Sequence, residues 1–341
     1  MPRSLIVLPD DSAKPILDAI EEAKSSLRIK MFIFSDPVLL RAVAAARARG
    51  LKVRVMLNPA RRSGEAENEA ARDQLLKADV LVEDGNPAFD LTHEKSMVVD
   101  DAIAFVKSLN WEPRNLTETR DYAVVTDDTG EVAEIIECFE ADWARKPFDP
   151  GDEAKLIWCN TNGRERIARF IDEAKHTLFV QNERYQDPVI IERLVRAKER
   201  GVKVHVMARA PHTLKKDKLL EGVSGLRILH DVGVKVHTLK HLKLHAKMLL
   251  ADGKAAVIGS INLAPGSFDA RRELGIEVRD KHVVRRIEEV ADRDWKHSRA
   301  LDLSDEGLLA DLEKRHKAGA GAEKLVLDSG DDRKPKSKDD D

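Results

Sequence analysis

Two stretches of the chain place a histidine and a lysine two residues apart, followed by an aspartate five residues after the lysine. They are His93, Lys95 and Asp100 in the first stretch and His245, Lys247 and Asp252 in the second. The flanking residues favour a β-strand, on which side chains two apart share a face, so each histidine and lysine should point together while each aspartate lies beyond them. Imidazole and ammonium groups on one face suit attack on a phosphodiester, which needs a nucleophile, an acid and neutralisation of its oxygens.

The two stretches belong to an internal duplication. Residues 20–24 return as 171–175, an offset of 151, and the strand-like segment 52–56 aligns with 203–207 without a gap. Around the motifs the offset becomes 152. There the second copy repeats the following residues of the first: His93 as His245, Lys95 as Lys247, Asp100 as Asp252, Ser108 as Ser260, Asn110 as Asn262, Asp121 as Glu273 and Trp143 as Trp295. A pattern that occurs twice at equivalent positions is not a chance match.

Elements that could position these residues alternate along each copy. In the first copy, residues 28–34 read as a strand, Pro37 opens a helix that ends at Gly50, a further helix covers 65–78, and 80–82 is a short strand. In the second copy, the pair Asp252-Gly253 predicts a hairpin that returns Ser260 and Asn262 beside the motif strand. The alternation predicts an α/β fold in which each copy forms a mixed sheet flanked by helices.

The motifs resemble those of the phospholipase D superfamily, in which His-x-Lys-x-x-x-x-Asp is followed by Gly-Ser-x-Asn. Residues 259–262 match the second element in full, whereas the first copy has Lys107 in place of the glycine. The resemblance spans residues 5 to about 298. It implies two pseudo-symmetric units, residues 1–148 and 149–300, with the active site at their interface, and leaves 301–341 as a C-terminal helix and a disordered tail.

The resemblance also implies roles for the shared residues. His93 would be the nucleophile that forms a phosphohistidine, and His245 the acid. Lys95, Lys247, Asn110 and Asn262 would hold the phosphate oxygens without a metal ion or cofactor. The family places a carboxylate downstream that holds the motif histidine; Asp121 and Glu273, each 28 residues after the histidine of its copy, fit this role. Ser108, Ser260, Asp100 and Asp252 would support the site.

Composition bears on the substrate. The chain has 341 residues, 58 lysines and arginines against 61 aspartates and glutamates, a net charge of −3 and 4% aromatic residues. This balance argues against a long basic groove with stacking platforms for bases. We therefore expect an enzyme that hydrolyses or transfers phospholipid head groups, with a nuclease of the same superfamily as the alternative. A degenerate scaffold that binds phosphorylated partners is disfavoured because all polar motif residues are present.

The remaining features indicate the setting of the enzyme. No segment has the length of a membrane span and the N-terminus lacks a signal-peptide pattern, so we expect a cytoplasmic protein with at most a peripheral membrane contact. Both motifs lie in one chain, which predicts a monomer. Cys138 and Cys159 should be buried and reduced. Trp143 and Trp295 should belong to the core, Trp111 fits the core or the cleft equally well, and the string from Lys235 to Lys243 fits a basic approach or a solvated strand.

Overall fold

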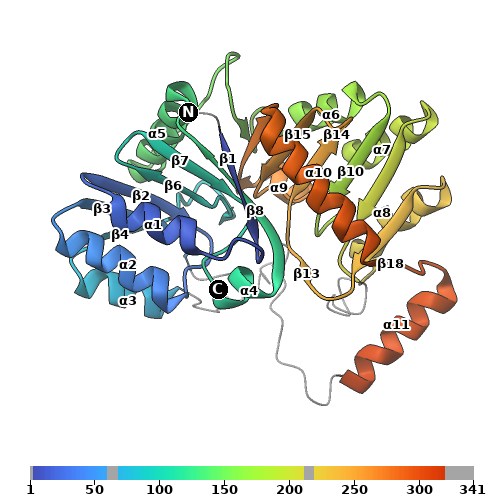
Figure 1. Ribbon diagram of the computed structural model, residues 1–341, viewed down its shortest axis with the longest axis horizontal. Coiled ribbons are helices and arrows are strands. Elements are labelled where there is room, and N and C mark those ends of the chain that lie inside the picture. Colours follow the sequence, from blue (N-terminus) through green and yellow to red (C-terminus); the bar gives the residue numbers. More distant parts are fainter. Residues whose placement is uncertain (1–2, 60–67, 211–218, 319–341) are drawn as a thin grey trace, which may run out of the picture.

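The computed structural model describes residues 3–59, 68–210 and 219–318. Two mixed β-sheets stand side by side, and helices cover their outer faces (Figure 1). The predicted α/β fold with two repeated units is confirmed. The predicted disordered tail, from residue 319 onward, lies outside the described residues.

The first sheet is built from the N-terminal copy. Its strands lie in the order β1-β8-β7-β6-β2-β3-β4. Their bounds are β1 Ser4–Leu8, β2 Ser26–Met31, β3 Lys52–Leu57, β4 Leu81–Asp84, β6 Ser96–Val99, β7 Ile103–Lys107 and β8 Thr119–Thr126. Strands β2, β3 and β4 run parallel, whereas β6, β7 and β8 are antiparallel neighbours. Parallel strands joined by helices and a following meander give the mixed sheet that the alternation predicts.

The second sheet repeats this plan with strands in the order β18-β12-β11-β10-β14-β15-β17-β9. Their bounds are β9 Ile157–Trp158, β10 Thr177–Gln181, β11 Lys203–Met207, β12 Lys235–Leu239, β14 Met248–Ala251, β15 Ala255–Gly259, β17 Leu274–Val278 and β18 Ser298–Ala300. As in the first sheet, three parallel strands precede three antiparallel ones. The motif strands β6 and β14 are therefore equivalent.

Helices cover both sheets, and the bounds of those in the first copy are α1 Lys14–Glu22, α2 Pro37–Ala48, α3 Glu69–Lys77, α4 Pro113–Thr117 and α5 Thr129–Trp143. Those that follow are α6 Gly163–Glu173, α7 Pro188–Glu199, α8 Leu219–Asp231, α9 Pro265–Asp269, α10 Lys281–Lys296 and α11 Asp305–Ala318. The helix predicted for 65–78 ends as expected, while part of its predicted start lies outside the described residues. None of the described helices combines the length and the hydrophobicity needed to span a bilayer.

The hydrophobic core has three parts. One lies under α1 to α3 and another under α6 to α8. The third lies between the sheets and takes residues from both copies, including Val106 and Tyr122 from the first and Phe179 and Ile258 from the second. Because this middle core is shared, each unit covers apolar surface of the other, and burial of that surface holds the two motifs in a fixed relation.

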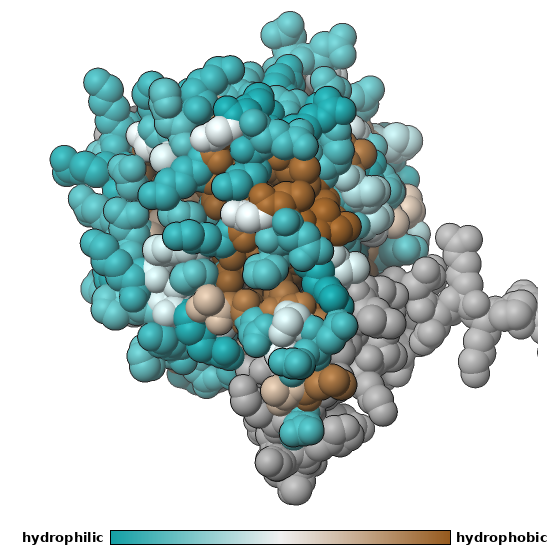
Figure 2. Space-filling view, turned by 90° about the vertical axis from the view of Figure 1, so that its right-hand side faces the viewer, coloured by the Kyte–Doolittle hydropathy of each residue, from teal (hydrophilic) through white to brown (hydrophobic). Residues whose placement is uncertain are grey.

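One end of the molecule carries apolar side chains at its surface. Figure 2 shows apolar side chains gathered among polar ones on the end that carries α7 and α8. Val189 on α7, Ile228 on α8 and Val232 just after α8 are exposed by 40%, 49% and 38%. Single exposed apolar side chains are common, but a group of them is a feature of interaction surfaces.

Candidate active site

Two short strand pairings cross between the units and bring the motifs together. Strand β5, Leu91–Thr92, pairs in parallel with β16, Arg271–Arg272, of the second unit. Strand β13, Lys243–Leu244, pairs in parallel with β8 of the first unit. Each unit therefore delivers its motif histidine, which directly follows β5 or β13, to a strand of the other unit.

The carboxylate that holds His93 comes from the second unit. His93 Nδ1 lies 2.8 Å from Glu273 Oε2, and both residues are buried. A carboxylate accepts a hydrogen bond, so the proton of the neutral ring stays on Nδ1 and Nε2 keeps its lone pair. Burial raises the pKa of Glu273.

His245 is held by the equivalent carboxylate of the first unit. Its Nδ1 lies 2.8 Å from Asp121 Oδ1. Two hydroxyls, those of Ser108 and Thr119, donate to the oxygens of Asp121 at 2.6 and 2.5 Å. The equal spacing of 28 residues within each copy suggests a histidine and carboxylate from the same copy, but the structure pairs them across copies.

An arginine next to each carboxylate is anchored in the same crossed manner. Arg272, beside Glu273, donates two hydrogen bonds of 2.9 Å to Asp142 of the first unit. Arg120, beside Asp121, donates two of 2.8 and 3.0 Å to Asp294 of the second. Sequence reasoning missed these pairs, although the repeat contains the signal, because both arginines and both aspartates recur at the offset of 152. The pairs fix the strands that carry the carboxylates.

The two motif lysines bond to the motif histidines, and the two predicted asparagines are buried. Lys95 Nζ and Lys247 Nζ each donate to the backbone oxygen of the motif histidine two residues earlier, at 2.6 Å. Asn110 and Asn262 are buried, and the Oδ1 atom of each finds no hydrogen-bond partner within the described part of the chain. An amide Oδ1 can only accept, so a contact with a phosphate oxygen must come from Nδ2, and the Nδ2 group of Asn110 already donates to Glu112 at 3.1 Å.

The aspartates of the two motifs do not belong to this cluster, as their parity predicts. Asp100 and Asp252 have φ values of 53° and 55° and begin tight turns. Asp100 accepts hydrogen bonds from the backbone N–H groups of residues 24–26, and Asp252 from those of 175–177. These bonds lower the pKa of Asp100 to about 2, although burial opposes the shift. Both aspartates thus tie the motif hairpin to the start of a neighbouring strand.

The two serines make equivalent backbone contacts. Ser108 Oγ exchanges hydrogen bonds with the backbone of Tyr122, as Ser260 Oγ does with that of Leu274, and Ser108 also donates to Asp121. Lys107, in place of the family glycine, ends β7 and pairs with Ala123 of β8. At Gly259 a Cβ atom would lie 2.2 Å from Leu274 O, so the second unit needs glycine.

The Lys107 ammonium is fully buried, 4.5 Å from the centroid of the Trp111 ring. Burial holds the pKa of Lys107 well below its usual value. The indole of Trp111 is itself fully buried and packs edge-on against Phe34. Of the two interpretations of Trp111, the structure favours the core.

The motif histidine and lysine have a different neighbour in each unit. The ring of Phe32 lies 4.7 Å from the His93 ring, centroid to centroid, and 5.0 Å from Lys95 Nζ. The equivalent residue of the second unit, at an offset of 151, is Glu183. Its Oε2 lies 2.6 Å from Lys247 Nζ and 3.8 Å from His245 Nε2. Sequence reasoning missed Glu183 because the two copies differ at this position.

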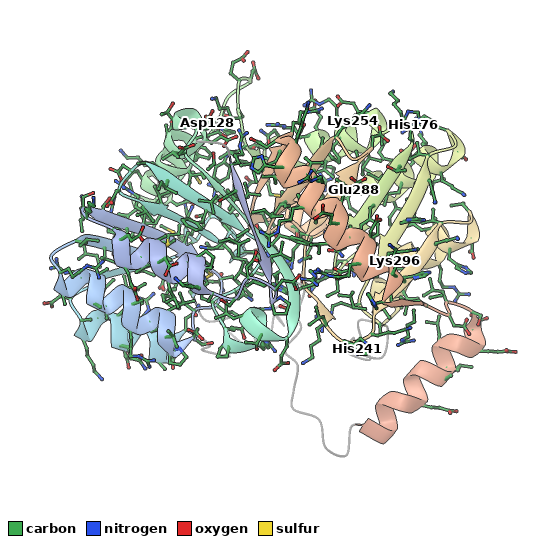
Figure 3. The ribbon with its side chains drawn as sticks, in the orientation of Figure 1. Asp128, His176, His241, Lys254, Glu288 and Lys296 are labelled. Carbon is green, nitrogen blue, oxygen red and sulfur yellow. The ribbon has the colours of Figure 1, made fainter. Side chains whose placement is uncertain are left out.

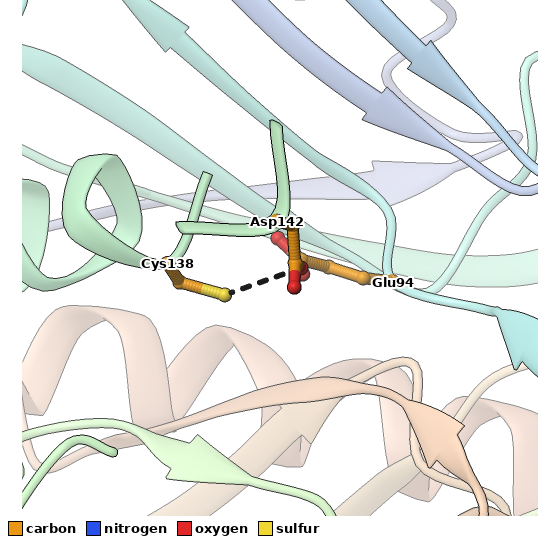
Figure 4. A group of neighbouring side chains, drawn as sticks. All are labelled: Glu94, Cys138 and Asp142. Carbon is orange, nitrogen blue, oxygen red and sulfur yellow. Dashed lines mark hydrogen bonds between the residues drawn. The ribbon is translucent and has the colours of Figure 1, made fainter. Parts of the chain in front are cut away.

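A buried cluster beside the first motif offers three ligand atoms of the kind that metals bind, from Glu94, Cys138 and Asp142 (Figure 4). Lys30 occupies the same cluster, with its ammonium 2.8 Å from both carboxylates and 3.5 Å from the thiol. Burial and these anions act oppositely on Lys30, and the anions raise its pKa. The Lys30 ammonium thus supplies the positive charge that balances the carboxylates. Cys138 and Cys159 are buried and free, as predicted.

The other singled-out side chains lie outside the cluster. Trp295 stacks against the rings of His205 and His237, at 4.2 and 3.8 Å, and Trp143 stacks on Phe139. Lys243 forms an exposed ion pair with Glu118. His241 lies in the loop that leads to β13, below the junction of the two units in Figure 3, whereas Glu288 and Lys296 lie on α10 and Lys254 lies in the turn between β14 and β15. The segment from Lys235 to Lys243 therefore does not form one basic surface, because Lys243 is exposed whereas His237 packs against Trp295.

Comparisons with known proteins agree with this geometry. The family model described as "Cardiolipin synthase, PLD-like domain" matches twice, at residues 16–143 and 167–295. Cardiolipin synthase B of Escherichia coli K12 is 26% identical over 313 residues, covering 78% of this chain and 74% of that protein. The mitochondrial cardiolipin hydrolase of Mus musculus is 32% identical over 141 residues, covering 41% of this chain and 61% of that protein.

Among solved structures, phosphatidylserine synthase of Haemophilus influenzae superposes with a TM-score of 0.71 at 13% identity and covers 93% of both chains. Polyphosphate kinase of Porphyromonas gingivalis superposes with a TM-score of 0.70 at 16% identity, over 93% of this chain and 53% of that one. At such identities the likeness concerns the fold. The two matches of the family model cover the repeated units and both motifs, and the chain therefore belongs to the cardiolipin synthase, PLD-like domain family and is an enzyme of the phospholipase D type.

Proposed function

We propose that the enzyme hydrolyses or transfers phospholipid head groups through a phosphohistidine on His93, without a metal ion. The observation that carries the proposal is the pair of crossed contacts, His93 with Glu273 and His245 with Asp121. They orient two imidazoles from opposite units, each with its Nδ1 atom tied back to a carboxylate. The Nε2 atoms are then the ones available for chemistry.

The neighbours of each ring support the assignment of roles. His245 has Asp121 at Nδ1 and Glu183 3.8 Å from Nε2, so carboxylates on both sides attract a positively charged ring. His93 has one such carboxylate, whose pKa burial raises, and the edge of an aromatic ring. A neutral His93 suits attack, and a charged His245 suits protonation of the leaving group.

The reaction then proceeds in two balanced steps. His93 Nε2 forms a bond to phosphorus, the bond from phosphorus to the head-group oxygen breaks, and His245 gives its proton to that oxygen. In the second step water or an alcohol gives a proton to His245 and attacks phosphorus, which breaks the bond to His93. Lys95, Lys247 and the two asparagines neutralise or bind the non-bridging oxygens in both steps.

Phospholipid is the substrate class that the relatives support. Cardiolipin synthase B and the mitochondrial cardiolipin hydrolase are named for the same lipid, and they match 78% and 41% of this chain. The net charge of −3 agrees, because it supplies no general attraction for a nucleic acid. The alcohol in the second step decides between hydrolysis and transfer.

The substrate is tested by direct competition. At physiological salt, purified enzyme should turn over phosphatidylglycerol or cardiolipin vesicles faster than single- or double-stranded DNA, and added ethanol should divert product to the phosphatidylethanol ester. His93→Ala and His245→Ala serve as matched inactive controls. Rapid, steeply salt-dependent DNA cleavage with inert lipids would establish the nuclease alternative.

The intermediate is tested by trapping it. With a labelled phosphodiester that has an aryl leaving group, His245→Ala should accumulate an acid-labile phosphoryl label, because the first step no longer needs an acid. The label should be absent from His93→Ala. Label that persists in His93→Ala at the wild-type level would assign the nucleophile to another residue.

Metal independence has its own test. Two lysines beside the motif histidines supply positive charge, so dialysis against a chelator should leave the rate within a factor of about two. A loss of activity that magnesium, manganese or zinc restores would contradict the proposed mechanism.

A further inference from the structure

Glu183 places a carboxylate at the reacting side of the second motif. Its side chain is 12% exposed and sits 3.8 Å from His245 Nε2, the atom assigned to the leaving group. Oε2 accepts from Lys247 at 2.6 Å, and Oε1 accepts from Arg209 at 3.0 Å. A negative group is unexpected here, because the substrate itself is an anion.

Glu183 remains ionised in this position. Burial opposes its negative charge, but Lys247, His245 and Arg209 outweigh burial and hold the pKa of Glu183 well below its usual value. Lys247 in turn commits two of its three N–H donors, one to Glu183 and one to the backbone oxygen of His245. Within the described part of the chain, one N–H donor of Lys247 is left for a substrate oxygen. The carboxylate of Glu183 already balances part of the positive charge of Lys247.

We infer that Glu183 makes the site selective for the charge of its ligand, admitting phosphodiester monoanions and rejecting phosphomonoester dianions. The inference rests on the proposed function, for which it names the charge state of substrate and product. A diester has one negative charge. A monoester has a second pKa near ~6 and is mostly a dianion above neutral pH. Glu183 repels the additional charge at close range in a poorly hydrated site.

The consequence concerns the end of the hydrolytic reaction. Hydrolysis of the phosphohistidine converts a bound diester into a monoester that carries one more negative charge beside Glu183. Repulsion then favours release of that product over its retention. The first unit has Phe32 at the equivalent position, so the selectivity is confined to the side where the leaving group departs and the acceptor arrives.

Binding of two small anions tests the inference without requiring turnover. Methyl phosphate and dimethyl phosphate differ by one methyl group and, at pH 8, by one charge. By calorimetry, wild-type enzyme should bind dimethyl phosphate at least as tightly as methyl phosphate, the reverse of the order expected at a simple cationic site. Glu183→Gln should tighten methyl phosphate on the order of tenfold or more and leave dimethyl phosphate within about threefold.

Two further variants separate charge from shape. Glu183→Asp keeps the charge and should keep the wild-type order. Glu118→Gln removes an exposed carboxylate that pairs with Lys243 elsewhere at the junction of the units, and it should change neither affinity. Three results would each overturn the inference. The wild type could bind methyl phosphate more tightly than dimethyl phosphate, Glu183→Gln could change both affinities equally, or that variant could show no gain in affinity for methyl phosphate. If lipids prove inert, the proposed function fails, and the two affinities still decide the role of Glu183.

Discussion

The two units share a backbone plan but surround their histidines differently. Around His93 lie one buried carboxylate and the ring of Phe32, while around His245 lie Asp121 and the ionised Glu183. The duplication thus places each of two similar imidazoles beside a carboxylate of the other unit. The side chains that break the symmetry give them different electrostatic surroundings, which the proposed two-step transfer requires.

The buried residues behind the two motifs also differ in charge between the units. Behind the first motif, Lys30, Glu94 and Cys138 form a buried charged cluster with Asp142. The second unit has Gln181, Ala246 and Val290 at the equivalent positions. The shared arginine and aspartate pairs are therefore embedded in a charged interior on one side and in a largely neutral one on the other. Symmetry of fold does not extend to symmetry of charge.

The largest effects should come from the two carboxylates that hold the histidines. Asp121→Asn and Glu273→Gln should each lower kcat by about 10²- to 10⁴-fold, because an amide no longer fixes the proton-bearing nitrogen. The comparison sharpens when an aryl leaving group is used, since its departure needs no acid. The first-step defect of Asp121→Asn, measured as the burst of released leaving group, should then shrink, while that of Glu273→Gln should remain. Equal rescue of both variants would argue against separate roles for the two histidines.

Removing the equivalent buried aspartate from each unit should lower the unfolding free energy by different amounts. Asp142→Asn leaves Lys30 and Arg272 without their shared carboxylate and should cost about 3–5 kcal/mol of unfolding free energy. Asp294→Asn leaves Arg120, which retains Asp10, and should cost about 1–3 kcal/mol. Urea denaturation of both variants measures the difference. A greater loss in Asp294→Asn would contradict the assignment of the charged interior to the first unit.

The same aspartate predicts a dependence on acid. Lys30 and Arg272 outweigh burial and hold the pKa of Asp142 at about 2, below the 3.8 of an ordinary aspartate. Its stabilising contribution is therefore complete above pH 3.8 and is lost as the pH falls toward 2. Asp142→Asn should remove this part of the acid sensitivity.

Much of the fold could be predicted from the sequence because the duplication doubles each signal. Helix α2 begins at Pro37 and ends just before Gly50, whose φ is 95°, as the terminal residues indicate. The predicted hairpin at Asp252 also forms. The crossing pairs β5 with β16 and β13 with β8 could not be predicted, since two-residue strands carry no periodicity.

The site was predictable where the copies agree. His93 and Lys95 lie between β5 and β6 and not on a strand as predicted, yet both contact the ring of Phe32, and Asp100 lies in the turn after β6. The partner of each histidine was not predictable, because spacing along one copy says nothing about exchange between copies. Glu183 was hidden for the opposite reason, since the contrast with Phe32 removes the repeat signal at the position where the chemistry differs.

A smaller effect should distinguish the tryptophans that end the two long helices. In the first unit the guanidinium of Arg54 lies 5.3 Å from the Trp143 ring, and in the second the equivalent residue is His205, stacked on Trp295. Burial, with Lys203, Lys235 and His237 nearby and Asp292 opposing, lowers the pKa of His205 to about 4.

The sign follows from the lowered pKa of His205. The neutral ring stabilises the fold fully above pH 6.5, and this contribution is lost as the pH falls toward 4, because the unfolded chain then binds a proton that the folded ring resists. Partial exposure of the ring reduces the effect to about 1–2 kcal/mol. Thermal unfolding of His205→Phe should show a flatter dependence between pH 6.5 and 4 than the wild type. An unchanged slope would place the acid sensitivity elsewhere.

The smallest expected effect is none. Both crossed contacts form within one chain, which predicts a complete monomer, so mixing His93→Ala with His245→Ala chains should restore no activity. Sedimentation of the wild type should show a single species of about 38 kDa. Recovery of activity in the mixture would mean that the units exchange between chains.

The crossing of β5 and β13 also bears on ancestry. A chain with one unit could form these contacts with an identical copy, but it would then carry the same residue at both equivalent positions. Phe32 and Glu183 could diverge because the copies are encoded separately. Joining the halves in one polypeptide thus permits a division of labour that no homodimer with identical subunit sequences can encode, and mutations in either half can be selected independently.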